Sequence, residues 1–267
     1  MRIALGVEYD GNAFKGWQRQ NGARTVQAEL EAALATVANQ IVTTVCAGRT
    51  DSGVHALYQV VHFDTSAKRS PRSWVLGTNS NLPRDVAVLW AREVPDDFHA
   101  RFSARRRRYA YLICNRPTRP GLWHGRVTWD YRPLDVARMG EAARLWLGEH
   151  DFSSFRAKGC QSRHPVRTVY RCEVERRDDI VIVQVEANAF LQHMVRNFVG
   201  VLAEIGSGAR PPAWAAEVLA WRQRERGGVT APPDGLYFCA VNYPAKYGLP
   251  PPPSAVPVPA TYHGYAF

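Results

Sequence analysis

Apolar and polar positions in the first hundred residues change period several times, which outlines a series of strands and helices. Apolar, β-branched runs of strand length alternate with two segments of helical character. Thr25 and Pro71 stand where helices begin, as an N-cap and as a first-turn residue. The resulting order, strand-helix-strand-strand-helix-strand, is a split βαβ pattern. The predicted strands are 2–9, 42–47, 57–63 and 86–94, and the predicted helices are 26–39 and 71–79.

The second half repeats this outline without repeating the sequence. An arginine run begins near Ser103, so we place a boundary there between two α+β halves, residues 1–104 and 105–245, with joined and mostly antiparallel sheets. Residues 246–267 are rich in proline and are expected to form an extended or disordered tail. The predicted strands are 107–114, 169–176, 180–187 and 237–243, and the predicted helices are 136–146, 190–205 and 211–222.

Composition changes this picture through charge. The 267 residues are 46% apolar and 22% charged, an ordinary globular balance, but the net charge is +10. Arginine dominates the excess, and its guanidinium group suits bidentate phosphate contacts. A polyanionic partner follows, most often a nucleic acid, although an inert basic surface would have the same composition.

Cysteine usage and the chain start indicate a reduced compartment. The five cysteines show no paired spacing and no zinc pattern. The first residues read as a strand and not as a signal peptide, and no apolar run reaches the length of a membrane span. We therefore expect a cytoplasmic protein without a metal site or a membrane partner.

The loop before the strand 57–63 concentrates groups suited to chemistry. Asp51 lies between Gly48 and Gly53, which permit unusual backbone angles or close approach of a ligand. Arg49 is two residues away, and a neighbouring cation favours the ionised carboxylate. Such a carboxylate can act as a nucleophile or a base. The alternative is an Asx-turn at Asp51 with a solvated Arg49.

Two further clusters combine arginines with aromatic or apolar neighbours. Arg101 and the run 105–108 precede Tyr109 and Tyr111, a combination that suits phosphates and stacked bases. A solvated charge run beside a core tyrosine is the structural alternative. On the polar half of the helix 190–205, Arg196 lies one turn before Gly200, where another backbone or a ligand could approach, unless this half is merely solvated.

Nine consecutive residues, 48–56, resemble the catalytic motif of the tRNA pseudouridine synthase A family. Four other segments match in the same order, and the resemblance extends from about residue 3 to about residue 243. Nine matches in a row are a specific signal, whereas Asp-Ser-Gly alone would not be. The other segments are Tyr9-Asp10-Gly11 with Phe14-Lys15-Gly16-Trp17-Gln18, Phe98-His99-Ala100-Arg101-Phe102, Arg108-Tyr109-Ala110-Tyr111, and Phe190-Leu191-Gln192-His193-Met194-Val195-Arg196.

The resemblance implies the pseudouridine synthase fold and an isomerase acting on uridines at positions 38 to 40 of the tRNA anticodon stem-loop, without cofactor or metal. It implies that Asp51 is catalytic, that Arg49 serves base flipping, that Tyr109 packs on the target base and that Arg196 pairs with Asp51. It also implies a homodimer with tRNA lying across both subunits. The implied tRNA contacts are Phe98, His99, Ala100, Arg101, Phe102, Gly159, Cys160, Gln161, Ser162 and Arg163.

Two other functions fit parts of the sequence. A tRNA-binding and folding module without catalysis would need the basic and aromatic residues, but not the intact Asp51, Arg49 and Arg196. A carboxylate glycosidase would need a second acid across the bond; Glu8 and Asp10 are available, but no spacing supports them. Conversion of labelled uridine, or release of a free base or sugar, distinguishes these possibilities.

Overall fold

The computed structural model describes residues 1–254 and 256, and contacts divide this part of the chain into two compact units. The first unit contains residues 1–107 and 237–254, and the second contains residues 108–236. Each unit combines helices with a sheet, so the predicted α+β class is confirmed. The break after residue 107 lies close to the predicted boundary at 104, but the last strand, which we assigned to the second half, packs with the first unit.

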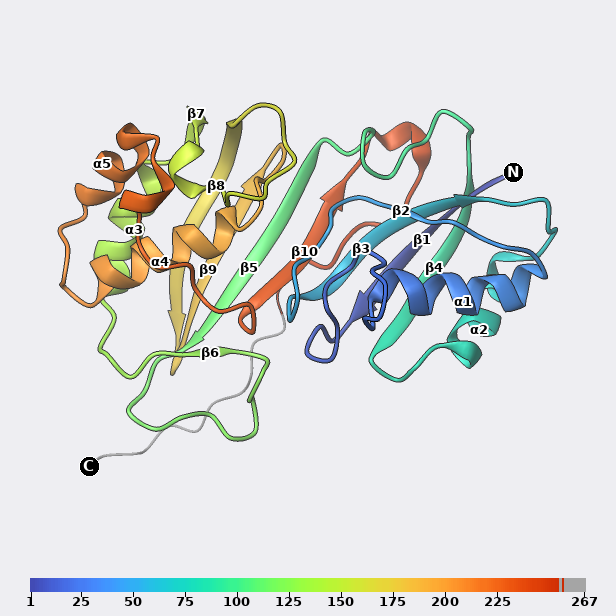
Figure 1. Cartoon of the computed structure of the whole chain (residues 1–267), viewed down its shortest axis with the longest axis horizontal. Coiled ribbons are helices and arrows are strands. Elements are labelled where there is room, and N and C mark those ends of the chain that lie inside the picture. The colour runs from blue at the N-terminus through green and yellow to red at the C-terminus, as the bar shows by residue number, and fades with distance from the viewer. Residues whose placement is uncertain (255, 257–267) are drawn as a thin grey trace. The chain divides into compact units, whose positions relative to one another are not determined.

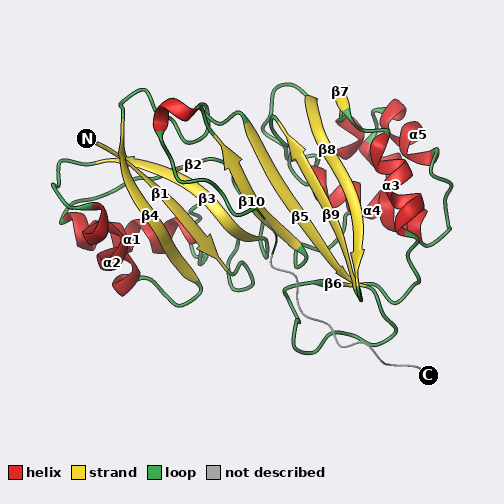
Figure 2. Ribbon diagram, turned by 180° about the vertical axis from the view of Figure 1, so that it is seen from behind, coloured by secondary structure: helices red, strands yellow, loops and turns green. Residues whose placement is uncertain are grey.

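In the first unit the strand order is β4-β1-β3-β10, with β2 also paired to β3. Strand β1 runs antiparallel to β3 and β4, and β10 runs parallel to the start of β3. Both helices cover one face of this sheet (Figures 1 and 2). Phe63 and Trp74 meet in the core between the layers. The elements are β1 (Arg2–Tyr9), α1 (Val26–Ala38), β2 (Val45–Cys46), β3 (His55–Asp64), α2 (Pro71–Asn81), β4 (Val86–Val94), β10 (Leu236–Asn242) and η3 (Ala245–Tyr247).

In the second unit the strand order is β5-β9-β8-β7, and β6 pairs with β5. The β8–β9 hairpin turns at Asp178, which has a φ of 54°. Trp146, just after α3, and Phe198 of α4 stack in the core of this unit at a centroid distance of 4.4 Å. The elements are β5 (Arg106–Cys114), β6 (Thr128–Trp129), α3 (Val136–Arg144), β7 (Gly148–Asp151), η1 (Ser153–Phe155), β8 (Val166–Arg177), β9 (Ile180–Ala187), α4 (Met194–Gly206), α5 (Trp214–Trp221) and η2 (Arg224–Arg226).

Several predicted boundaries were wrong for identifiable reasons. Helix α4 begins at Met194 instead of residue 190, because His193 has a φ of 63°, which no α-helix accommodates. Thr25 has the extended backbone of an N-cap, but its side chain makes no capping hydrogen bond. The predicted strand 42–47 contracts to the two residues of β2.

The predicted disordered tail also began too early. Residues 245–247 form the turn η3, and Tyr247 is buried against Phe98. The Tyr58 hydroxyl donates a hydrogen bond to the carbonyl of Pro250. Aromatic and backbone contacts anchor this segment although it has no apolar periodicity. Of the predicted tail, residues 255 and 257–267 lie outside the described part of the chain.

Candidate active site

Asp51 lies on the loop that joins β2 to β3 in the first unit. Its carbonyl accepts a hydrogen bond from the Val54 amide at 3.2 Å, which closes a turn, and Gly53 has the φ of 78° that this turn requires. Asp51 is half-buried, and Arg49 is exposed. The loop therefore presents a carboxylate and a guanidinium group from a fixed backbone.

The segment after β1 fastens this loop. The Trp17 amide donates to the carbonyl of Thr50 at 3.0 Å, and the Ser52 hydroxyl donates to the carbonyl of Phe14 at 3.2 Å. The hydroxyls of Tyr9 and Thr50 lie 2.8 Å apart. Residues on both sides of Asp51 are thus bonded to the segment 9–17. Such support restricts the motion of a catalytic carboxylate before substrate binds.

Two glycines allow this close approach. A Cβ on Gly11 would lie 2.1 Å from the carbonyl oxygen of Val54, and a Cβ on Gly16 would lie 2.7 Å from that of Thr50. Gly16 also has a φ of 88°, which side chains rarely adopt. The glycines of the segment 9–17 are therefore part of the support of Asp51.

Arg107 connects the Asp51 loop to the segment 98–102. Its guanidinium group donates to the carbonyl of Ala47 at 3.2 Å and to that of Arg101 at 2.6 Å, and its side chain is buried. We interpreted the whole arginine run as potential phosphate contacts, which is wrong for this residue. Because residues alternate along β5, Arg106 is exposed while Arg107 faces inward.

Two histidines shape the turn at 98–102. The Nδ1 atom of His62 accepts the amide of Ala100 at 3.1 Å, and Nδ1 of His99 accepts the amides of Arg101 and Phe102 at 3.2 Å each. The Phe102 ring stacks on His99 at a centroid distance of 4.3 Å and is 76% exposed. An aromatic ring and a cation thus project from a braced backbone.

We expect His62 to make the protein less stable at acidic pH. Burial, followed by the charges of Arg2 and His99, lowers the pKa of His62 from 6.5 to about 4, although Asp64 acts in the opposite direction. Because the unfolded chain binds this proton first, stability is lost as the pH falls from 6.5 towards 4. We expect the free energy of unfolding to be about 2 kcal/mol lower at pH 5 than at pH 8, measured by urea denaturation.

The variant His62→Asn is the control for this prediction, because its side-chain oxygen can accept the Ala100 amide without titrating. It should remove most of the loss between pH 8 and pH 5. An unchanged pH dependence in this variant would contradict the assignment to His62.

In the second unit Tyr109 packs against the segment before α4. Its ring meets that of Phe190 edge-on at 4.9 Å, and the side chain is buried. The loop 159–163 is attached to the same segment, since the amide of Gln192 lies 3.5 Å from Sγ of Cys160. Burial opposes ionisation of this thiol, but the amides of Gln192 and Ser162, together with the Arg156 guanidinium group, outweigh it and lower the pKa of Cys160.

Arg196 lies in the first turn of α4 and is bonded to a loop that ends before β10. Its Nε donates to the carbonyl of Ala231 at 2.7 Å, and the Ala231 amide donates back to the carbonyl of Arg196 at 3.1 Å. A Cβ on Gly200 would lie 1.7 Å from the carbonyl oxygen of Val229. The expectation that another backbone approaches Gly200 is confirmed.

Comparison with known proteins identifies the family. The family model described as tRNA pseudouridine synthase matches residues 6–103 and 142–244. The chain belongs to the tRNA pseudouridine synthase family.

Enzymes of this family are isomerases, and several relatives match almost the whole chain. It is 58% identical to tRNA pseudouridine synthase A of Methylococcus capsulatus, over 93% of this chain and 92% of that protein. It is 58% identical to the Nitrosococcus oceani protein of the same name, over 94% and 96%, and 54% identical to that of Escherichia coli, over 94% and 93%.

The predicted site residues of this synthase-family chain fall into one group in each unit. Asp51, Arg49 and the segment 98–102 belong to the first unit, where Arg107 links their backbones. Tyr109, Arg196 and the loop 159–163 belong to the second unit, where they are near the segment 190–192 or continuous with it.

Sequence analysis missed two supporting elements. The first is Arg107, which no local pattern distinguished from its exposed neighbour Arg106. The second is the loop 229–232, whose Pro232 carbonyl accepts the Tyr111 hydroxyl at 2.8 Å. The Pro-Pro-Asp-Gly sequence at 232–235 indicated a loop, but not what it would contact.

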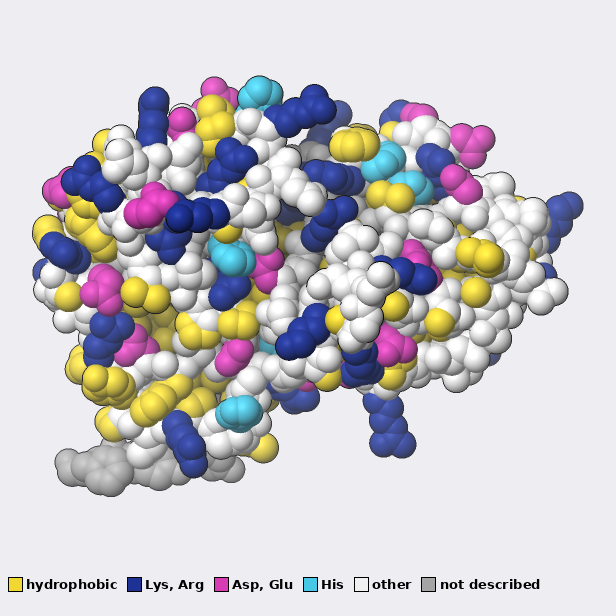
Figure 3. All heavy atoms as spheres, in the orientation of Figure 1, with side chains coloured by type: hydrophobic (Ala, Val, Ile, Leu, Met, Phe, Trp, Pro, Cys, Tyr) yellow, Lys and Arg dark blue, Asp and Glu magenta, His cyan; other side chains and the backbone are white. Residues whose placement is uncertain are grey.

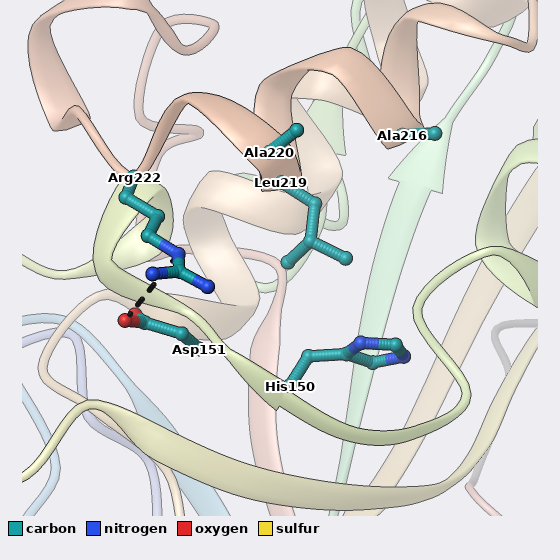
Figure 4. A pocket seen from close by; sticks show the side chains of 6 residues that line it. All are labelled: His150, Asp151, Ala216, Leu219, Ala220 and Arg222. Carbon is teal, nitrogen blue, oxygen red and sulfur yellow. Dashed lines mark ion pairs between the residues drawn. The ribbon is translucent and has the colours of Figure 1, made fainter.

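One pocket in the second unit is lined by none of these residues (Figure 4). Arg222 and Asp151 form an ion pair of 3.6 Å at its edge. Residues 1–254 and 256 contain no group of His, Cys, Asp and Glu side chains placed to hold a metal ion, and no helix among them is long and apolar enough for a membrane crossing. The pocket is lined by His150, Asp151, Ala216, Leu219, Ala220 and Arg222.

Proposed function

We propose that this chain converts uridine to pseudouridine at positions 38 to 40 of the tRNA anticodon stem-loop, with Asp51 as the catalytic residue. The observation that carries the proposal is the nine-residue motif 48–56, which holds Asp51 on a loop fastened on both sides. The family membership supplies the reaction class. We further propose a cytoplasmic homodimer that binds tRNA across both subunits, as the sequence resemblance implies.

The reaction breaks the N1–C1′ bond of uridine and rejoins the base to C1′ through C5, with release of the C5 proton. Apart from protons exchanged with water, no atom is gained or lost and no electrons are transferred, so the reaction is an isomerisation. An ionised Asp51 could attack the sugar, attack the base or promote elimination, and each route begins with the same carboxylate. Arg196 is proposed to keep this carboxylate ionised and aimed.

A uridine within a stem must leave the base stack before an enzyme can reach it. Arg49 is exposed and two residues from Asp51, so its side chain is suited to fill the space that the base vacates. Tyr109 would then hold the flipped base. The exposed Arg101 and Phe102, together with the loop 159–163, would contact the surrounding RNA. Lysine and arginine side chains are spread over the face shown in Figure 3, consistent with a phosphate-dominated footprint.

The test is to map pseudouridine in an unmodified tRNA transcript after incubation with the pure protein. Release of tritium from C5-labelled uridine measures the same reaction quantitatively. Modification at positions 38 to 40 is expected. Tight binding without any conversion would instead favour the non-catalytic tRNA-binding module.

Substitutions at Tyr109 test its role at the base. Tyr109→Leu removes the ring, and since stacking contributes about 1–3 kcal/mol per base, we expect turnover to fall by roughly tenfold or more. Tyr109→Phe keeps the ring and its contact with Phe190. If the hydroxyl moves a proton, Phe will be nearly as damaging as Leu; if the ring only stacks, Phe will retain most activity. Wild-type turnover in both variants would contradict the assignment.

A further inference from the structure

The end of the first unit encloses the turn at 98–102 from its inner side. Phe98 is fully buried, with a relative exposure of 0%. The ring of Tyr243 lies 5.2 Å from that of Phe98, and the ring of Tyr247 meets Phe98 edge-on at 5.0 Å. The Tyr243 hydroxyl donates a hydrogen bond of 2.6 Å to the carbonyl of Ala100. Two tyrosines from the last described part of the chain thus contact a segment about 145 residues earlier.

This end segment has further attachments of its own. Lys246 forms an ion pair of 2.5 Å with Asp97, and the Asn242 carbonyl accepts the Arg105 amide at 2.8 Å. The Tyr58 hydroxyl donates a hydrogen bond to the Pro250 carbonyl, and neither residue belongs to the turn at 98–102. Burial raises the pKa of Tyr58 to about 12 and that of Tyr243 well above its usual value, so both hydroxyls remain donors at neutral pH.

The turn presents its side chains outward while its backbone is held from within. Arg101 and Phe102 are exposed, and the Ala100 carbonyl between Phe98 and these residues is bound by Tyr243. A loop that is already ordered loses less conformational entropy when a ligand binds. Loss of the hydrogen bond to the Ala100 carbonyl should therefore weaken binding of RNA to Arg101 and Phe102, although the group that donates this bond does not contact the RNA.

We propose that Tyr243 is a positioning residue for tRNA binding, which holds the 98–102 turn in its binding conformation through the carbonyl of Ala100. This inference rests on the proposed function, in which the turn contacts tRNA. Tyr243 makes no contact with the reacting uridine in this scheme, so its effect is on affinity and not on the chemical step.

The experiment compares Tyr243→Phe with Tyr58→Phe in the full chain. Each variant removes one hydroxyl that donates to a backbone carbonyl, but only the Ala100 carbonyl lies in the turn. With an unmodified tRNA transcript we expect Tyr243→Phe to raise Kd about fivefold, the equivalent of one hydrogen bond, and to leave turnover at saturating tRNA unchanged. Tyr58→Phe should leave Kd within about twofold, although both variants should lose similar thermal stability.

Arg101→Gln shows whether the turn contacts tRNA at all. If it weakens binding while Tyr243→Phe does not, or if the two tyrosine variants change Kd equally, the positioning role is overturned and the proposed function stands. If Arg101→Gln leaves Kd unchanged, the tRNA contact of the turn fails and the positioning role fails with it. Pseudouridine formation by the wild-type chain is measured separately, so failure of the catalytic proposal is distinguishable.

Discussion

Asp51→Asn is expected to reduce pseudouridine formation below detection while the protein folds normally and binds tRNA within a few-fold of wild type. Asparagine keeps the size of the side chain and most of its hydrogen bonding, but it can serve neither as nucleophile nor as base. No other carboxylate lies in the loop 47–56 to replace it. Affinity should survive because phosphate contacts elsewhere dominate it.

Asp51→Glu should also fail, because it moves the reacting oxygen by about 1 Å or more, and such a displacement can reduce the rate about 10²-fold. Asp178→Asn is the matched control, since it makes the same change on the β8–β9 hairpin, at a φ of 54° that asparagine tolerates. It should retain wild-type turnover. The measurements are tritium release, tRNA binding and circular dichroism on each variant. Substantial turnover by Asp51→Asn would refute the mechanism, and loss of folding would assign Asp51 a structural role.

Gly200→Ala is expected to destabilise the protein, although alanine normally stabilises a helix interior. The added Cβ would lie 1.7 Å from the carbonyl oxygen of Val229, so backbone must move. Overpacking of this kind typically reduces stability by about 1–3 kcal/mol, which exceeds the gain in helix propensity of about 1 kcal/mol. The displaced loop includes Ala231, whose carbonyl accepts a hydrogen bond from Arg196. Turnover, measured at a temperature at which the variant is folded, should therefore also decrease.

Gly140→Ala in α3 provides the matched control. A Cβ there meets nothing within 4 Å, so only the propensity effect remains. Thermal denaturation should show a higher melting temperature for Gly140→Ala and a lower one for Gly200→Ala. A raised melting temperature in Gly200→Ala would mean that the 229–231 loop adjusts freely and is not a fixed support of Arg196.

Local pattern was informative where one physical rule decided the outcome. The predicted strands 2–9 and 86–94 match β1 and β4, because apolar runs of this length pack well as strands within a sheet, whichever direction the neighbouring strands take. The hairpin around Asp178 was also predictable, because its turn residues tolerate positive φ. Pattern failed at residue 190, where the apolar period continued but His193 takes a left-handed conformation. Periodicity reports which residues are apolar, and it does not report a single backbone angle.

The arginine run shows the same limit for the site. Arg106 and Arg107 are chemically identical in the sequence, yet Arg106 is exposed and Arg107 binds the carbonyls of Ala47 and Arg101. Their difference depends on which face of β5 is covered, a property of packing and not of residue type. The prolines after residue 249 likewise indicated an extended or disordered segment, but nothing in them indicated that the Tyr58 hydroxyl, contributed by a distant strand, binds the carbonyl of Pro250.

The sequence by itself determined the motif around Asp51, the α+β class and the basic character of the surface, because each depends on residue identity over short spans. Only the tertiary structure decided that β10 joins the first unit, that Arg107 links the Asp51 loop to the turn 98–102, and that Val229 packs at Gly200. The contacts of β10 and of Gly200 join residues that are 29 or more positions apart along the chain. The Arg107 contact joins one buried side chain to two separate backbone carbonyls. Which partner such groups meet is set by the packing of whole elements, and local patterns carry no record of it.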